Sequence, residues 1–311
     1  MNTHANAVHD STLEAQAAKV AVVSPLRTLY WSLRREFWEN RSLYIAPLAV
    51  AAVFLFAFAV SISHTLHRIG RAPSLAPDKQ LQAITTPYDL AAGLLMFTGI
   101  LVGVFYCVEA LQGERRDRSI LFWKSLPVSD LTTVFAKAVI PIFLLPLLIS
   151  VVSFALQWSM FFVASAALLA TGQSVSMYWT QLALPQMSLL VIYHLVVVHG
   201  IWHAPFYGWF LLVSAWARRM AFLWAILPAL AVFALERLLF NTSHIAAMLG
   251  RRLSGGASEV MTMPGTMPIH PATTHVTFLH FLFSPGLWIG LAVTAAFLAG
   301  AIRLRRYRDP N

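Results

Sequence analysis

Charged residues are scarce in this chain. Of its 311 residues only 11% are Asp, Glu, Lys or Arg, whereas 58% are hydrophobic; soluble domains usually carry about 25% charged residues. So few charges do not cover the surface of an ordinary soluble enzyme, and so large an apolar fraction excludes a disordered chain. The formal net charge of +9 alone would suggest a nucleic-acid-binding surface, but the apolar runs described below favour a membrane and no nucleic acid.

Several other features are missing. The single cysteine, Cys107, excludes an internal disulfide framework and a Cys-based metal cluster. Residues 1–23 have no basic stretch leading into an apolar core, so they predict a polar N-terminal tail and no secretory signal. The sequence contains no internal repeat and no GxxxxGK[ST] motif for binding nucleotide phosphates. We therefore expect no enzyme activity and no cofactor in this chain.

Long apolar runs are what the sequence does contain. A membrane-crossing helix needs roughly 20 apolar residues, and six runs meet this need. Ser284 and Pro285 fit the N-cap and the first helical position of the last one. The predicted fold is an all-α integral membrane protein with a six-span domain over 43–311. The predicted spans are residues 43–63, 90–108, 138–165, 189–217, 220–237 and 285–302. If the third and fourth runs each split, the count becomes eight short spans.

The basic residues predict an orientation. With the N-terminus inside, 16 of the 22 Lys and Arg residues fall in segments that face the cytoplasm, as the positive-inside rule requires. Both termini are therefore predicted to be cytoplasmic.

Residues 24–42 predict an amphipathic helix that lies in the membrane interface. Ser24 fits the N-cap and Pro25 the first helical position, while Trp31 and Trp38 suit the headgroup region. A cytoplasmic helix that packs on its own protein is the alternative. The residues that fall on one helical face are Leu26, Leu29, Tyr30, Leu33 and Phe37.

Residues 109–137 form the longest predicted cytoplasmic segment. A mixed-sign charge cluster is followed by a short apolar run, and Ser129 or Asp130 can cap the next helix. Apolar side chains supply contact area and charges fix register, so the segment predicts a docking surface; a solvated basic flank is the alternative. The candidate docking residues are Glu114, Arg115, Arg116, Asp117, Arg118, Ile120, Leu121, Phe122 and Trp123.

The histidines and methionines suggest a second possible role, in metal binding or proton relay. His199 and His203 lie four residues apart in the predicted fourth span, near His194, and could bind a metal or relay protons. No carboxylate and no HExxH motif accompanies them, and packing across helices is the alternative. The predicted outer loop, 240–284, has thioether and imidazole groups that suit Cu(I). Those groups belong to Met261, Met263, Met267, His270 and His275.

The string ERRDRSILFWKSLPVSD at 114–130 resembles the second intracellular segment of proteobacterial ABC-2 type transporter permeases. The strings REFWENR at 35–41 and GWFLLVSAWARR at 208–219 are similar to their amphipathic N-terminal helix and fourth-span end. The resemblance covers the whole chain in order.

The resemblance implies a permease subunit, an exporter of the bacterial inner membrane. A coupling helix within 109–137 would dock on a separate ATPase subunit that holds ATP and Mg²⁺, and a second permease copy, identical or paralogous, would complete a dimer among membrane lipids. ATP-driven closure of the ATPase pair would then rock the spans between inward- and outward-facing states. The alternatives are an intramembrane metal-dependent enzyme that uses His199 and His203, and a membrane anchor without transport.

Overall fold

The computed structural model describes residues 24–74, 76–117, 119, 128–253 and 282–307, and over these residues it is helical, with no strand. The elements in chain order are α2 (Pro25–Glu39), α3 (Ser42–Val60), α4 (Ile62–Arg71), η1 (Ala72–Ser74), α5 (Pro77–Arg116), α7 (Asp130–Val139), η2 (Ile140–Leu144), α8 (Leu145–Ala170), α9 (Ser176–Leu182), α10 (Leu184–Tyr193), η3 (His194–Trp202), α11 (Ala204–Trp216), α12 (Ala221–Phe240), α13 (His244–Leu253) and α16 (Pro285–Tyr307).

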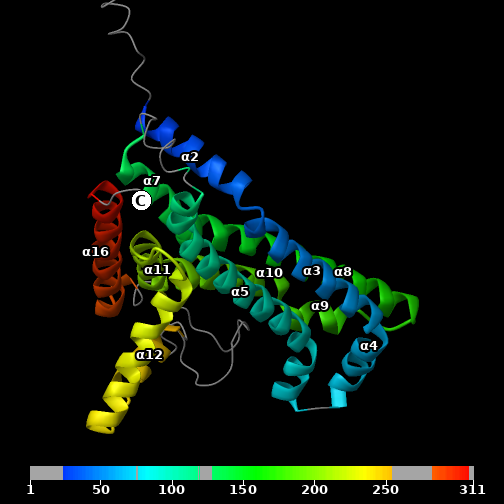
Figure 1. The fold of residues 1–311 in the computed structure, drawn as a ribbon. Helices are drawn as coiled ribbons and strands as arrows, with labels where there is room; N and C mark the ends of the chain where they lie inside the picture. Colours follow the sequence, from blue (N-terminus) through cyan, green and yellow to red (C-terminus); the bar gives the residue numbers. More distant parts are fainter. Residues whose placement is uncertain (1–23, 75, 118, 120–127, 254–281, 308–311) are drawn as a thin grey trace, which may run out of the picture.

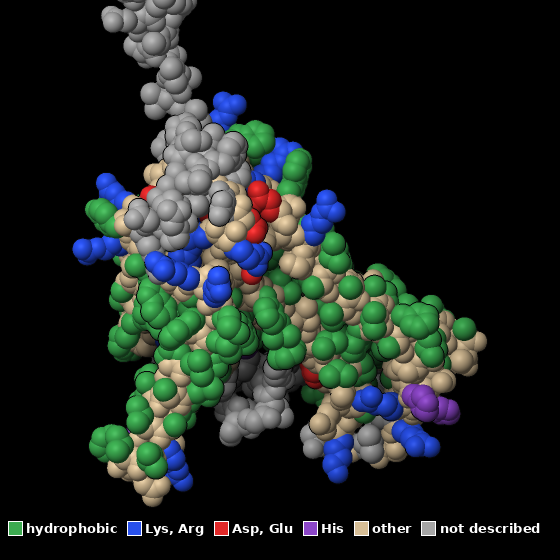
Figure 2. All heavy atoms as spheres, viewed as in Figure 1, with side chains coloured by type: hydrophobic (Ala, Val, Ile, Leu, Met, Phe, Trp, Pro, Cys, Tyr) green, Lys and Arg blue, Asp and Glu red, His purple; other side chains and the backbone are tan. Residues whose placement is uncertain are grey.

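Six stretches of helix are long and apolar enough to cross a membrane, which confirms the predicted all-α, multi-pass architecture. Figure 2 shows a band of hydrophobic side chains around the middle of the molecule, with Lys and Arg gathered at its two ends. Because lipid tails are as apolar as these side chains, the band needs no water-facing cover. The stretches are Ser42–Val60, Lys79–Arg116, Asp130–Ala170, Tyr178–Trp202, Ala221–Phe240 and Pro285–Tyr307.

The second span is longer than its hydropathy predicts. The predicted span is 90–108, but α4 ends at Arg71 and α5 already begins at Pro77. Pro77 fits the start of α5 because the first turn of a helix has no partner for that N–H. Pro87 lies inside α5, and a membrane helix tolerates an interior proline when neighbouring groups satisfy the freed carbonyl.

The fourth span also differs from the predicted range 189–217. It starts with α9 and α10, which are separated by Ala183 at a φ of 43°, and it continues through η3. A new helix, α11, begins after His203, and Pro205 in its first turn has no N–H to continue the earlier ladder. The spanning stretch therefore ends at Trp202, and α11 packs separately along α5 and α16.

Two π-helices, η2 and η3, pack against each other in the interior. Gly200 of η3 lies so close to η2 that a Cβ on it would sit 2.3 Å from the Ile142 carbonyl oxygen. The buried cluster to which both π-helices contribute also includes residues of α3, α4, α5, α7, α8, α9, α10 and α11. Figure 1 shows how these helices are arranged. The two π-helices thus meet at a backbone contact that only glycine permits.

Gly200→Ala should destabilise the protein, although alanine favours a helix more than glycine does. The added methyl group has to push backbone rather than a flexible side chain, and overpacking of this kind costs about 1–3 kcal/mol. Thermal unfolding in detergent, followed by size-exclusion chromatography, measures the loss. Gly250→Ala is the matched control, because a Cβ there meets nothing within 4 Å. Equal stability of the two variants would contradict the prediction.

Candidate functional site

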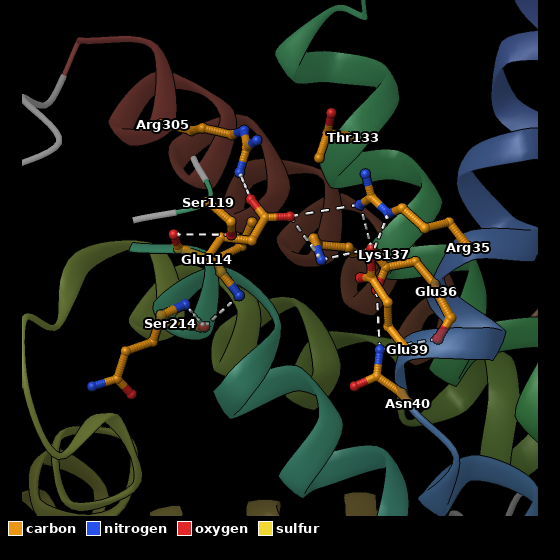
Figure 3. A network of polar contacts seen from close by, with 12 residues as sticks. Arg35, Glu36, Glu39, Asn40, Glu114, Ser119, Thr133, Lys137, Ser214 and Arg305 are labelled. Carbon is orange, nitrogen blue, oxygen red and sulfur yellow. Dashed lines mark hydrogen bonds and ion pairs between the residues drawn. The ribbon is translucent and has the colours of Figure 1, made fainter. Parts of the chain in front are cut away.

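A cluster of charged side chains lies where α2, the end of α5, α7 and the end of α16 meet (Figures 1 and 3). These four elements are far apart in sequence, and each contributes at least one charged residue. Three of its members lie within the 109–137 segment in which docking is predicted. We call it the charge hub, and its members are Arg35, Glu36, Glu114, Asp130, Lys137 and Arg305.

Glu36 of α2 is the most deeply buried acid of the charge hub, with 1% of its side chain exposed. Its Oε1 lies 2.7 Å from Lys137 Nζ and 2.8 Å from an Arg35 guanidinium nitrogen. Its Oε2 accepts hydrogen bonds from the Tyr106 hydroxyl at 2.9 Å and from the Asn40 amide at 3.4 Å. Both carboxylate oxygens are therefore satisfied by protein groups, as a buried ion requires.

Two opposing effects act on the pKa of Glu36. Burial disfavours the charged form and raises the pKa, while the Lys137 charge and the hydrogen bonds from Lys137 and Arg35 lower it. The attraction outweighs burial, so the pKa lies below its ordinary value of 4.5. Glu36 is thus ionised at neutral pH.

Glu114, at the end of α5, connects the two halves of the charge hub. Its Oε1 lies 3.2 Å from Lys137 Nζ and 3.7 Å from Arg35, and its Oε2 pairs with Arg305 of α16. Arg305 also donates from Nε to Asp130 Oδ1 at 2.9 Å. One guanidinium therefore holds Glu114 and Asp130, the residues at the two ends of the 114–130 segment.

Arg115 faces the interior and caps α11. Its guanidinium donates to the carbonyls of Ser214, Ala215 and Ala217, at 2.5 Å for Ala215 and 2.8 Å for Ala217. A cation at a helix C-terminus satisfies the last carbonyls and complements the helix dipole. The Ser214 hydroxyl completes the junction by donating to the Val108 carbonyl at 2.7 Å. The end of α5 is thereby fastened to α11.

The predicted docking residues divide into three groups. Glu114 and Arg115 make the internal contacts just described, whereas Arg116 and Asp117 are exposed, with 64% and 62% of their side chains accessible. Arg116 pairs with Asp117 at 3.1 Å and with Glu109 at 2.7 Å. Arg118, Ile120, Leu121, Phe122 and Trp123 lie outside the described residues. Docking through this segment stays a prediction, with Arg116 and Asp117 as its visible surface. Ser129 caps α7 as predicted, accepting from the Thr132 N–H at 3.0 Å.

The α2 helix begins at Pro25 after Ser24, as predicted, and presents aromatic side chains outward. The Arg34 guanidinium lies 5.1 Å from the Trp31 ring and 4.9 Å from the Trp38 ring, and both tryptophans are exposed. The sequence predicts that the apolar residues of this helix share one face. In the structure Leu33 and Phe37 pack on the core, whereas Leu26 and Tyr30 are exposed.

The three histidines of the fourth span do come together. The ring centroids of His194 and His199 are 5.3 Å apart, as are those of His199 and His203. No group of three His, Cys, Asp or Glu in the described part of the chain is arranged to hold a metal ion. The methionines and histidines proposed for copper lie outside the described residues.

Sequence reasoning missed the charge hub. Glu36 and Lys137 are 101 residues apart, and Glu114 and Arg305 are 191 apart, so no local spacing relates them. One signal was present: Lys137 stands directly before the long uncharged run that begins at residue 138. A lysine at the start of a span, without an acid near it in sequence, requires a partner from another helix.

The comparisons with known proteins returned no likeness: no family model matches the sequence, and neither a curated protein nor a solved structure is similar to it. The functional argument therefore depends on the sequence and on the geometry of the charge hub.

Removing one member of the central pair should be strongly destabilising. Lys137→Met leaves Glu36 buried without its closest cation, which costs about 3–5 kcal/mol for a broken buried pair. The combined Glu36→Gln, Lys137→Met variant should recover part of this loss, because no charge is then left unpaired. Unfolding in mixed detergent and SDS micelles measures all three. Glu109→Gln, at an exposed pair, is the control and should change little.

The same pair predicts a pH dependence. The folded-state pKa of Glu36 is depressed, so its stabilising contribution is present above the ordinary value of 4.5 and is lost as the pH falls below that value through the lower folded pKa. The Glu36→Gln, Lys137→Met variant should lose less stability over this range than the unmodified protein. Parallel curves for the two proteins would contradict an ionised Glu36.

Proposed function

We propose that the chain is the membrane subunit of an ABC-2 type transporter, an exporter driven by a separate ATPase. Three features support this: the multi-pass helical architecture, the absence of a phosphate-binding motif in the sequence, and the resemblance of the 114–130 string to the permease coupling segment. A transport chain without a motor takes its energy from a partner. The docking site for that partner is the segment between the end of α5 and the start of α7.

The observation that carries the proposal is the anchoring of this segment at both ends. Arg305 holds Glu114 and Asp130 together, while Arg115 fastens the end of α5 to α11. A segment with fixed ends transmits force from a docked partner into the helices that continue from it. Here those helices are α5 and α7, each continuous with a span. The charge hub thus serves as the rigid base of a coupling segment.

In this proposal the exposed charges of Arg116 and Asp117 set the register of docking, and Glu109 completes their surface. The six-span chain has both termini in the cytoplasm of a bacterium, with α2 in the interface of the inner membrane. Exposed Trp31 and Trp38 beside Arg34 fit a headgroup layer that contains anionic lipid. A second permease copy completes the transporter, and the sparsely packed α12, of which 11% is buried, is available for protein or lipid contact.

Charge reversal at the exposed surface tests the proposal. The Arg116→Glu, Asp117→Arg variant places like charges against a complementary partner, which costs several kcal/mol and should weaken ATPase binding by about 100-fold. The proposal predicts an ABC ATPase encoded by a neighbouring gene. Co-purification with that ATPase, and the ATP hydrolysis that the complex supports, are the readouts.

Arg219→Glu provides the matched control, because Arg219 is also exposed but lies in the short segment between α11 and α12. The control should bind the ATPase as the unmodified chain does. If no ATPase co-purifies with the unmodified chain, or if both variants bind equally well, the proposed function is wrong.

A further inference from the structure

The histidines of the fourth span form a row inside the membrane region. In the π-helix η3 the backbone hydrogen bonds join residues five apart, so His194 and His199 lie one above the other with ring centroids 5.3 Å apart. His203, which directly follows η3, continues the row at 5.3 Å from His199. An ordinary α-helix would bring together only residues three or four apart. The π-helix therefore builds a column of three imidazoles.

Each imidazole of the column has a buried Nδ1 without a hydrogen-bond partner among the described protein groups. A buried polar atom left unsatisfied costs about 1–3 kcal/mol. For His203 the chemistry is defined further, because Nε2 lies 3.1 Å from the Leu253 carbonyl oxygen, which can only accept. Nε2 therefore carries the hydrogen and Nδ1 of the neutral ring carries a lone pair. That Nδ1 is a base that can accept a proton.

Buried polar atoms also occur on α8, which packs against both α10 and η3. The Ser188 hydroxyl donates to Gln157 Oε1 at 3.4 Å. Gln157 Nε2 and Ser153 Oγ are buried and meet no partner in the described part of the chain. Buried water is held by polar atoms of this kind, typically two to four per molecule. The seam between α8 and the α10–η3 stretch thus carries buried polar atoms of the kind that hold water.

The charged and titratable neighbours of the column favour a proton over a metal ion. No charged or titratable side chain comes from α8, from η2 or from α16 up to Ile302. Arg252 of α13 donates to the Trp202 carbonyl at 2.9 Å and stacks on the Trp202 ring, next to His203. A divalent cation would be repelled twice as strongly as a proton by this charge. Tyr193 of α10, Tyr207 of α11 and Cys107 of α5 are titratable residues on the other elements that contact η3.

We propose that the column of His194, His199 and His203 binds protons and passes them along the seam between α8 and α10–η3 through water. A proton that arrives through water binds the lone pair at Nδ1 and makes an imidazolium. The imidazolium then gives up a ring N–H proton to the next water or imidazole, so that no electron moves and no other reactant is needed. Repulsion from Arg252 falls with distance, which favours the bound charge at the His194 end.

Proton flux into liposomes tests the proposal without any ATPase, so its failure is distinguishable from failure of the proposed transport function. The full chain is reconstituted with a pH-sensitive dye inside, and a potassium diffusion potential drives protons across. We expect flux above that of protein-free liposomes, and His199→Gln should reduce it to the protein-free level. His67→Gln is the matched control, because His67 is exposed on α4, and should leave the flux unchanged.

A second measurement covers the case in which His199→Gln does not fold. In a Cys107→Ser background, a cysteine at Ser153 should react with a small water-soluble thiol reagent, whereas one at Val151, on the exposed apolar surface of α8, should not. Flux no greater than in protein-free liposomes, equal flux in His199→Gln, or an unreactive Ser153→Cys would each overturn the proposal. Binding of Zn²⁺ to the chain in place of proton flux would assign the column to a metal.

Discussion

The buried ion pair between Glu36 and Lys137 is the constraint from which the inner architecture follows. Each charge is almost fully enclosed, so neither is tolerable without the other. Lys137 also lies near Glu114, and Glu114 in turn pairs with Arg305. Each buried charge therefore needs an opposite charge from another helix. Four segments that are distant in sequence are thereby fixed in one arrangement. Apolar packing is not directional, so it alone does not specify this arrangement of the four segments.

Different interactions stabilise the two ends of the molecule. At the charge hub, ions fix helix termini to one another with defined geometry. At the other end, Glu236 of α12 accepts from the backbone N–H groups of His244 and Ile245 and caps α13, while most of the large apolar side chains of α12 are exposed. The surrounding lipid sets the position of such a helix more than protein contacts do. The molecule therefore has a rigid end and a more compliant end.

Much of the fold follows from sequence because hydropathy is a local property. Charge-free runs predict the spans, and Ser129 and Pro285 predict two helix starts. The charge hub depends on contacts across more than 100 residues, so no window contains both Glu36 and Lys137. The π-helices are also not predictable from local spacing. α-Helical spacing brings His199 next to His203 but leaves out His194, which joins the column because η3 is a π-helix.

The continuity of α7, η2 and α8 relates the charge hub to the histidine column. Moving α7 away from α2 would separate Glu36 from Lys137, at a cost of about 3–5 kcal/mol, so the elements of the charge hub are expected to move as one body. The next place along the chain where the helix can change its hydrogen bonding is η2, which starts three residues after Lys137. Because η2 touches η3 at Gly200, one residue after His199, a shift of the charge hub would reach the histidine column through backbone contact. In the transporter proposed above, the π-helices would thus be the hinge between the docked ATPase and the interior of the membrane domain.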